Sequence, residues 1–501
     1  MGTRGDGTTI EGAQAACVNC HRRSGLGGAE GHIIIPPIIA PYLFRPLEVN
    51  VRDPTTPHVP GFIPHHGPYT ATTFMRVVRA GLDPDGKPLG ALMPRFDLDD
   101  TTLRQMIDYL DALARHDARG VEPHALHFAS IVAADADPAA SRRMIAILEQ
   151  FFADQNDGAH RYFDGKYRGE PPVLSGVEQT YNTRRKWILH VWRLRGAPDT
   201  WSMQLRTLLK NEPVFATVSG MGGADWRPVH EFCEQNELPC LFPNVLAPEV
   251  APGDFYPLYF SAGVSLEARL MAQRIRAEHV RGQVDRVVQI HTGVAAAEAA
   301  VRALDKELAH TNIETAVRSV RPQTGTFQAA WPSSDVADRS AVILWLSPQE
   351  LAGLPPPPGK AALVLASGLL GGLEDAPLSS AWRSSVHVTY PFDLPEARAL
   401  RMRLPLEWLR LHHIEIVDER IQTDTYLACV ILARTLDRML DSFLPDYLIE
   451  RVEDSLGNRT SNGYYPHLGL ARDQRFASRG GYIAHFTASG ILAADGEWSA
   501  P

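Results

Sequence analysis

The sequence predicts a multidomain chain in which a small all-α domain is followed by a two-lobed α/β module with parallel sheets. The chain has 501 residues, more than one hydrophobic core usually organises. A Cys-x-x-Cys-His motif near the N-terminus precedes amphipathic helical segments. From about residue 125, strand-like and helix-like segments alternate, and this alternation starts again near residue 255.

Composition is that of a soluble globular protein, with 45% apolar and 21% charged residues. The formal net charge of −9 is spread along the chain and offers no basic patch, so we expect no nucleic-acid partner. No apolar run reaches about 18 residues, so we expect no membrane span.

The motif at the N-terminus is Cys17-x-x-Cys20-His21, the attachment sequence of a c-type haem. Each thiol can form a thioether with one haem vinyl group, and the adjacent imidazole then lies beneath the iron as an axial ligand. A zinc half-site or a redox-active thiol pair also contains C-x-x-C, but no second half-site with metal-ligand spacing is present. The sequence therefore predicts one covalent haem c with its iron.

A second axial ligand is expected at Met93, which Pro94 and an amphipathic helical segment follow. A thioether sulfur is a soft ligand that favours reduced iron. The alternative is a core methionine that does not bind iron. The rival ligands are three histidines of a proline-rich loop: His58, His65 and His66.

Residues 1–118 resemble a class I monohaem cytochrome c domain. The resemblance rests on the order of C-x-x-C-H, a proline-rich apolar segment, Gly-x-Asp-Pro-x-Gly at 81–86, Met-Pro and a closing helix. It implies that Cys17 and Cys20 attach the haem and that His21 and Met93 are its proximal and distal ligands. Pro37 would be the proline whose carbonyl orients the proximal imidazole. The expected haem pocket consists of Pro37, Leu92 and Pro94.

Localisation follows from the haem, because bacteria attach haem c outside the cytoplasm. Residues 1–6 contain no apolar signal core. We therefore expect a periplasmic protein whose signal peptide has been removed.

The remaining three cysteines are too few for a disulfide-stapled fold. Cys429 lies in an apolar helical pattern and is expected to be a buried, inert thiol. Cys233 and Cys240 flank a helix-to-strand turn and can form a disulfide or stay reduced, because closeness in sequence does not guarantee the required geometry.

After a linker at 119–124, residues 125–501 form the α/β module. Lobe one is expected at about 125–250 plus C-terminal returns, and lobe two at about 255–385. The expected strands are Leu126–Ala133, Trp187–Trp192, Val214–Val218, Pro239–Phe242, Arg286–Ile290, Ala341–Leu346 and Leu363–Ala366.

The segment Val214–Gly223 is a strand that enters a turn of small residues before a helix, and Glu237–Asn244 supplies the next strand. This order resembles the first lobe of the type I periplasmic binding proteins, the branched-chain amino acid and amide binders. Phe255–Arg276 resembles the crossing into lobe two, and Tyr390-Pro391 lies where a return is expected. The family's opening glycine-rich turn is replaced by Ala133–Pro138, so the resemblance does not specify an amino acid as the ligand.

In such a fold a ligand lies at the carboxyl ends of the strands. The residues expected there are Ser219, Gly220, Met221, Gly222, Asn244, His291, Thr292, Ser367 and Gly368. Backbone N–H groups at a helix N-terminus suit a carboxylate or another anion. The alternative is that these are ordinary, well-capped βα turns. Because Ser219 lacks the G-x-S-x-G context, no catalytic nucleophile is expected.

Three functions compete. The favoured one is electron transfer to a redox partner, such as a periplasmic dehydrogenase or another cytochrome, because His21 and Met93 together leave no open iron site. The α/β module would then dock the partner or sense a small-molecule ligand. The first alternative is the substrate-binding protein of an ABC-type importer with an accessory haem domain. The second is a haem enzyme such as a peroxidase, which requires that Met93 does not bind iron.

Overall fold

The computed structural model describes residues 2–4, 7–30, 33–45, 66–114, 119–163, 185–223, 225–320, 336, 338–359, 361–439, 442–456 and 460–501. The chain divides into two compact units. The first comprises Met1–His127, Gln155–Trp187 and Leu432–Val452, and the second comprises Phe128–Asp154, Ile188–Ile431 and Glu453–Pro501. The first unit therefore ends near the predicted linker but also includes two later segments that the sequence does not indicate.

The N-terminal region packs three helices around a small apolar core. They are α2 (Ala40–Phe44), α3 (Ala71–Ala80) and α4 (Asp100–Ala114), and α1 (Val18–His21) carries the haem motif. The buried core residues are Leu43, Tyr69, Phe74, Val77, Val78, Leu103 and Leu110. Thr70 caps the start of α3, and Gly81, at φ +69°, ends it.

This region is not all-α, which corrects the expectation. Strands β1 (Gly2–Thr3), β2 (Thr9–Ile10) and β5 (Arg95–Phe96) form one small sheet, and β3 (Gly28–Glu30) pairs with β4 (Ile33–Ile35). Three consecutive isoleucines make up β4, and β-branched residues favour extended backbone. Strand β5 directly follows Pro94, whose ring disfavours helix at the residue before it.

The second unit contains a six-stranded sheet in the order β18-β10-β9-β8-β6-β7. Its strands are β6 (Ala125–Val132), β7 (Lys186–Arg193), β8 (Ala216–Val218), β9 (Cys240–Leu241), β10 (Pro257–Ser261) and β18 (Phe476–Ser478). Ala129 and Ile131 of β6 pack in one core with α7 (Trp201–Asn211) and α8 (Arg227–Gln235). Phe128 instead meets Phe152 of α5 (Pro138–Phe163), with ring centroids 5.8 Å apart. Both faces of β6 are therefore covered, which explains its nearly continuous apolar sequence.

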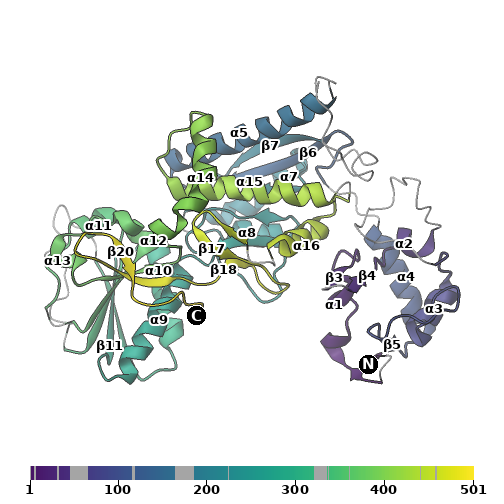
Figure 1. The fold of residues 1–501 in the computed structure, drawn as a ribbon, viewed down its shortest axis with the longest axis horizontal. Helices are drawn as coiled ribbons and strands as arrows, with labels where there is room; N and C mark the ends of the chain where they lie inside the picture. Colours follow the sequence, from purple (N-terminus) through teal and green to yellow (C-terminus); the bar gives the residue numbers. More distant parts are fainter. Residues whose placement is uncertain are drawn as a thin grey trace. The chain divides into compact units, whose positions relative to one another are not determined.

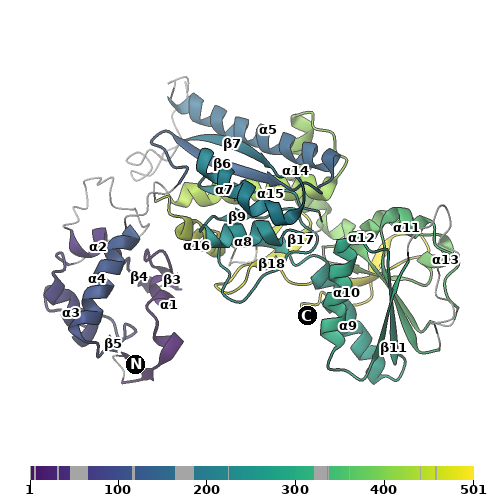
Figure 2. The same ribbon diagram turned by 180° about the vertical axis from the view of Figure 1, so that it is seen from behind.

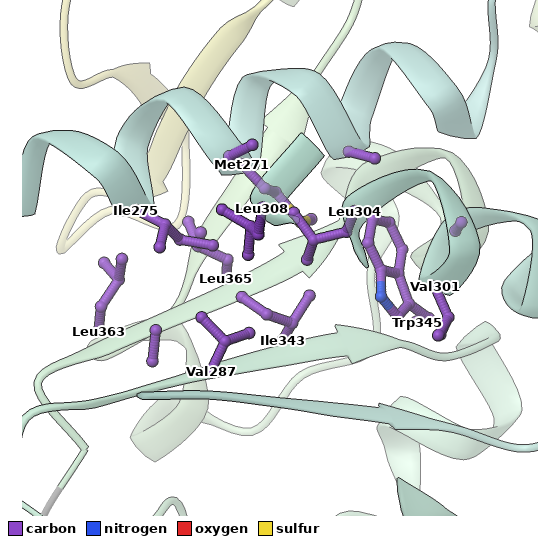
Figure 3. Close-up of a cluster of buried hydrophobic side chains, with 14 of the residues drawn as sticks. Met271, Ile275, Val287, Val301, Leu304, Leu308, Ile343, Trp345, Leu363 and Leu365 are labelled. Carbon is purple, nitrogen blue, oxygen red and sulfur yellow. The ribbon is translucent and has the colours of Figure 1, made fainter. Parts of the chain in front are cut away.

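A seven-stranded sheet follows in the order β12-β11-β13-β14-β15-β19-β20. Its strands are β11 (Arg286–His291), β12 (Glu314–Ser319), β13 (Ser340–Trp345), β14 (Leu363–Ser367), β15 (His387–Tyr390), β19 (Tyr482–Phe486) and β20 (Leu492–Ala494). The first five are parallel, and β19 and β20 are antiparallel to their neighbours. Helices α9 (Val264–Val280) and α10 (Ala295–Leu308) cover one face, where Met271 and Leu304 lie over Ile343 and Leu365 (Figure 3).

The described chain passes between these two sheets three times. It leaves the first sheet after β10, returns after β15 through α14 (Pro395–Leu411), and leaves again between β18 and β19. Helix α15 (Glu419–Met439), helix α16 (Pro445–Leu456) and the hairpin β16 (Thr460–Asn462)–β17 (Tyr465–Leu468) lie on the returning segment (Figures 1 and 2). The two-lobed α/β organisation with parallel sheets is thus confirmed. Among the described helices, none is both long enough and apolar enough to cross a bilayer.

Candidate functional sites

The haem motif lies on one short helical turn. Cys17 is the N-cap of α1, and Cys20 and His21 are its last two residues. The His21 N–H donates to the Cys17 carbonyl at 2.9 Å, which closes the turn. Cys20 is exposed, Cys17 is half-buried and His21 is only 6% exposed, so the thiols are more accessible than the imidazole.

The His21 ring is fixed by the backbone carbonyl of Pro36, with Nδ1 and the oxygen 2.8 Å apart. Because Nδ1–H donates to that carbonyl, Nε2 carries the lone pair that can bind a metal. Burial lowers the pKa of His21, which favours the neutral, ligating imidazole. The sequence predicted Pro37 for this role, and the structure corrects the position by one residue.

A glycine turn brings the proline segment to His21. Gly27, at φ +70°, donates its N–H to the His21 carbonyl at 3.0 Å. A Cβ atom on Gly27 would lie 2.1 Å from the Ile35 carbonyl oxygen, so only glycine fits. Pro36 and Pro37 are adjacent and chemically alike, and the sequence pattern does not show which carbonyl this turn presents.

The predicted distal side is less defined. Met93 and Pro94 are half-buried, and Leu92 is 57% exposed. No described contact joins Met93 to His21, so the distal ligand stays a prediction. His58 and His65 lie outside the described residues, and the His66 ring packs against Tyr69 at 4.8 Å. Within the described ranges, no cluster of three or more His, Cys, Asp or Glu side chains forms a ready-made metal site.

The residues around the motif fit a covalently attached porphyrin. Two thiols and one neutral imidazole lie on one turn. Four large apolar side chains of the N-terminal region are exposed: Val18 (42%), Ile33 (42%), Ile34 (53%) and Leu92 (57%).

The loop after the motif is anchored by a residue that the sequence pattern does not reveal. Ser24 donates both its backbone N–H (2.9 Å) and its hydroxyl (2.5 Å) to the carboxylate of Glu450 on α16. Glu450 is 2% exposed, and burial raises its pKa to about 7. The ion pair between Arg23 and Asp446, at 3.3 Å, lies beside this contact. Since 426 residues separate Ser24 from Glu450, no local sequence signal could indicate it.

In the second unit, the expected anion cradle at 219–222 is not formed. Ser219 N–H donates to the Leu241 carbonyl (2.8 Å), Met221 to Ile131 (2.8 Å) and Gly222 to Asn244 (3.3 Å). Met221 thereby bridges both neighbouring strands, so the sheet continues past β8. Helix α8 begins only at Arg227. The N–H groups of Ser219, Met221 and Gly222 are therefore committed to the sheet itself.

The side chains at the same strand ends meet one another. Asn244 Nδ2 donates to Ser219 Oγ at 3.1 Å, and Ser219 Oγ lies 3.2 Å from Thr425 Oγ1 on α15. Thr425 is fully buried, whereas Ser219 and Asn244 are 1% and 9% exposed. The sequence indicated Ser219 and Asn244 but gave no signal for Thr425.

In lobe two, the polar groups at the strand ends are likewise hydrogen-bonded to other groups of the chain. Ser367 Oγ and the Leu369 N–H, the latter at 3.0 Å, both donate to the carboxylate of Glu267 on α9. Thr389 Oγ1 donates to the same carboxylate at 2.8 Å and accepts a bond from the Gly368 N–H at 3.4 Å. Glu267 is fully buried, and burial raises its pKa to about 7.

The two remaining candidates end β11. His291 is 7% exposed, and its Nδ1 accepts the Gly293 N–H at 3.2 Å. Thr292 differs, because its buried hydroxyl has no hydrogen-bond partner in the part of the chain that the structure describes. Of the nine predicted strand-end residues, Thr292 thus keeps an uncommitted polar group.

The predicted cysteine pair is brought together as two thiols. Cys233 on α8 and Cys240 on β9 are both fully buried and free, and the Cys233 thiol donates to the Cys240 sulfur. That bond and burial raise the pKa of Cys233 well above its usual value, whereas the same bond lowers the pKa of Cys240. Cys429 is buried, as expected, and burial raises its pKa.

No protein-family model matches this sequence, and a comparison with curated proteins gives no match. Solved structures do match. One is a branched-chain amino acid ABC transporter protein from Thermus thermophilus with bound valine, at TM-score 0.52 and 12% identity, covering 76% of this chain and 98% of that one. Another is an ABC transporter substrate-binding protein from Aeropyrum pernix, at TM-score 0.51 and 15% identity, covering 75% and 96%.

These likenesses concern the fold. The α/β region has the two-lobed architecture of the type I periplasmic binding proteins, as the sequence resemblance predicted. At 12% and 15% identity, they do not carry over a ligand or a binding residue.

Proposed function

We propose that the α/β module is a solute-binding module and that solute recognition, rather than partner docking, is its activity. The observation that supports this is the two-lobed α/β fold, which is similar to solved structures of ABC transporter proteins, one of them a substrate-binding protein. Open α/β sheets bind ligands at the carboxyl ends of their strands. The solute is then delivered to a membrane importer of the ABC type outside the cytoplasm. The sequence alone favoured electron transfer as the main function, with solute binding for an importer as the first alternative; the proposal reverses that order.

Ligand capture from a mixture tests the proposal for a solute of any identity. The full chain, freed of small molecules by dialysis under partial denaturation, is refolded and incubated with a bacterial metabolite extract. Mass spectrometry of the retained small molecules should find a compound that also raises the unfolding temperature in a saturable way. Denatured protein is the control. Retention of nothing specific, with no thermal shift from any fraction, would refute solute binding.

We further propose that residues 1–118 carry one covalent haem c and that this domain exchanges electrons with a redox partner protein. The bond between His21 Nδ1 and the Pro36 carbonyl supports it, because it sets the tautomer that leaves Nε2 for iron. When bound, the haem supplies one-electron redox chemistry. Cys17 and Cys20 tether the group, Pro36 orients the imidazole, and Glu450 holds the loop through Ser24.

Maturation with a haem c assembly system tests this second function. The purified chain should carry covalent haem, seen in its absorption spectrum and intact mass. A Met93→Ala variant then separates electron transfer from peroxidase chemistry. Loss of the methionine–iron absorption band supports Met93 as a ligand and a closed iron, whereas an unchanged spectrum would favour an open one. Cys429→Ala is the matched cysteine control and should retain the haem.

A further inference from the structure

We propose that the outer face of helix α14 pairs with the same face of a second copy of this chain, so that the protein forms a two-fold dimer. This inference goes beyond the two proposed functions and depends on neither of them. It rests on an apolar stripe along α14 and on two charged residues of that helix which complement an antiparallel copy.

The inward face of α14 already has its partners within the α/β module. The buried residues of the helix are Arg398, Met402, Pro405 and Leu409. Trp408 Nε1 donates to Asp154 Oδ2 of α5 at 2.9 Å, and the Trp408 ring lies 5.0 Å from the ring of Tyr426 on α15. The module therefore holds this helix without using its outer face.

The outer face carries three leucines that the fold leaves in solvent. Leu400, Leu404 and Leu411 are 74%, 78% and 73% exposed, and among the described large apolar residues only Val280 is more exposed. At about 100° per residue, the three leucines fall within about 40° of one another on the helix. Their spacings of four and seven residues are those of the a and d positions of a heptad repeat, the pattern by which two helices bury a common seam.

The stripe also contains a carboxylate. Glu407 takes the remaining heptad position, between Leu404 and Leu411; it is 69% exposed and forms an ion pair with Arg410 at 3.1 Å. Arg403 is exposed, and among the described residues it has no ion-pair partner. A carboxylate that becomes buried in an apolar interface needs a cation beside it. A partner that covers the stripe must therefore bring a positive charge to Glu407.

A second copy of α14 supplies that charge. In a two-fold dimer the same patch meets itself and the two helices run antiparallel. When Leu400 lies opposite Leu411 of the second copy, a rise of about 1.5 Å per residue puts Arg403 within about 1.5 Å, along the helix axis, of the level of Glu407 of that copy. Both residues lie on the same side of the leucine stripe, and the two-fold axis brings these like sides together. The dimer thus gains two opposite-charge contacts, which set its register.

The affinity should be modest. Three leucines per copy are few beside the about 20–30 residues a side of a standard interface, so we expect a dissociation constant between about 10 µM and about 1 mM. Sedimentation velocity of the full chain over that concentration range should show the mass rising from one chain toward two. Leu404→Glu should weaken the association at least about tenfold, because a buried leucine is replaced by a charge. Met203→Glu changes a residue of α7 that is 69% exposed and should leave the association unchanged.

A charge exchange tests the partner and the register. Arg403→Glu and Glu407→Arg each place like charges opposite each other in a dimer of identical chains, so each variant alone should associate at least about tenfold more weakly. An equimolar mixture of the two variants should associate again, since each contact between unlike chains then joins opposite charges. Circular dichroism confirms that every variant is folded.

A wild-type chain that stays monomeric throughout this range would overturn the proposal and leave the stripe to another occupant, such as a membrane importer or another part of the same chain. Association that Leu404→Glu does not weaken would overturn it as well. A mixture of the two charge variants that associates no better than either one alone would show that Arg403 and Glu407 do not meet across a two-fold axis.

Discussion

The two candidate sites differ in how far along the chain their parts lie. Around His21, the thiols and the orienting Pro36 carbonyl come from within 20 residues. At the strand ends, Glu267 and Ser367 are 100 residues apart, and Ser219 and Thr425 are 206 apart. The first site is a property of one segment. The second exists only when the whole α/β fold is assembled, and its hydrogen bonds are shared with that assembly.

The largest effect should come from removing the local site. Cys17→Ala with Cys20→Ala should abolish covalent haem, because no thioether can form. The unfolding transition of the α/β module should remain, since the core of that module contains no residue of the motif. Intact mass and calorimetric scans measure both. If the double variant also lost the unfolding transition of the α/β module, the haem site could not be a property of its own segment alone.

The next largest effect should be on the stability of the α/β module. Arg475 and Glu453 form an ion pair at 2% and 5% exposure, and Arg475→Met should cost about 3–5 kcal/mol because the buried Glu453 carboxylate loses the positive charge of Arg475. Denaturant titration measures the free energy of unfolding. Adding Glu453→Gln to Arg475→Met should recover most of the lost unfolding free energy. A double variant no more stable than Arg475→Met alone would show that the buried charge of Glu453 is not the cause of the loss.

A pH effect follows from Glu267. Its pKa of about 7 lies above the usual 4.5, so the folded state holds its proton more tightly than the unfolded state. The associated stability is complete below about pH 4.5 and is lost as the pH rises to about 7, by about 3 kcal/mol. Glu267→Gln should therefore narrow the difference in unfolding free energy between about pH 5 and about pH 8. Glu450→Gln, a matched buried glutamate in the first unit, should leave the second unit's transition unaffected.

The smallest effect should come from Thr425. Thr425→Val removes a hydroxyl that lies against Ser219 and Asn244, and about 1 kcal/mol of stability should be lost. Thr423→Val, on the same helix, removes only bonds to backbone carbonyls of its own turn and serves as the control. If Thr423→Val costs as much or more, the strand-end contact of Thr425 adds nothing.

The sequence predicted features that depend on one segment better than features that depend on residues far apart in the chain. Alternating strands and helices indicated two parallel sheets, because periodicity is a local property that survives in the fold. The thiols and imidazole were found because they are contiguous. Pro37 was predicted instead of Pro36 because the sequence does not show which carbonyl a glycine turn directs toward His21. The all-α prediction also missed short strands of the N-terminal region, such as the one that follows Pro94.

The strand-end candidates show the opposite case. Position after a strand correctly placed Ser219, Asn244 and Ser367 at the carboxyl ends. Their hydrogen-bond partners, Thr425 and Glu267, come from helices far away in sequence. Whether a strand-end donor is open to a ligand depends on such partners, and no spacing rule contains them.

The C-terminal strands have a consequence for biosynthesis. Strand β18 closes one edge of the first sheet against β10, and β19 pairs with β15 in the second sheet. A ribosome that stops before Phe476 leaves both β10 and β15 with an unpaired edge. Open edges of this kind recruit other chains and proteases. Synthesis of residues 476–486 is therefore the event that allows both sheets to close these edges, and products that stop before it should be short-lived.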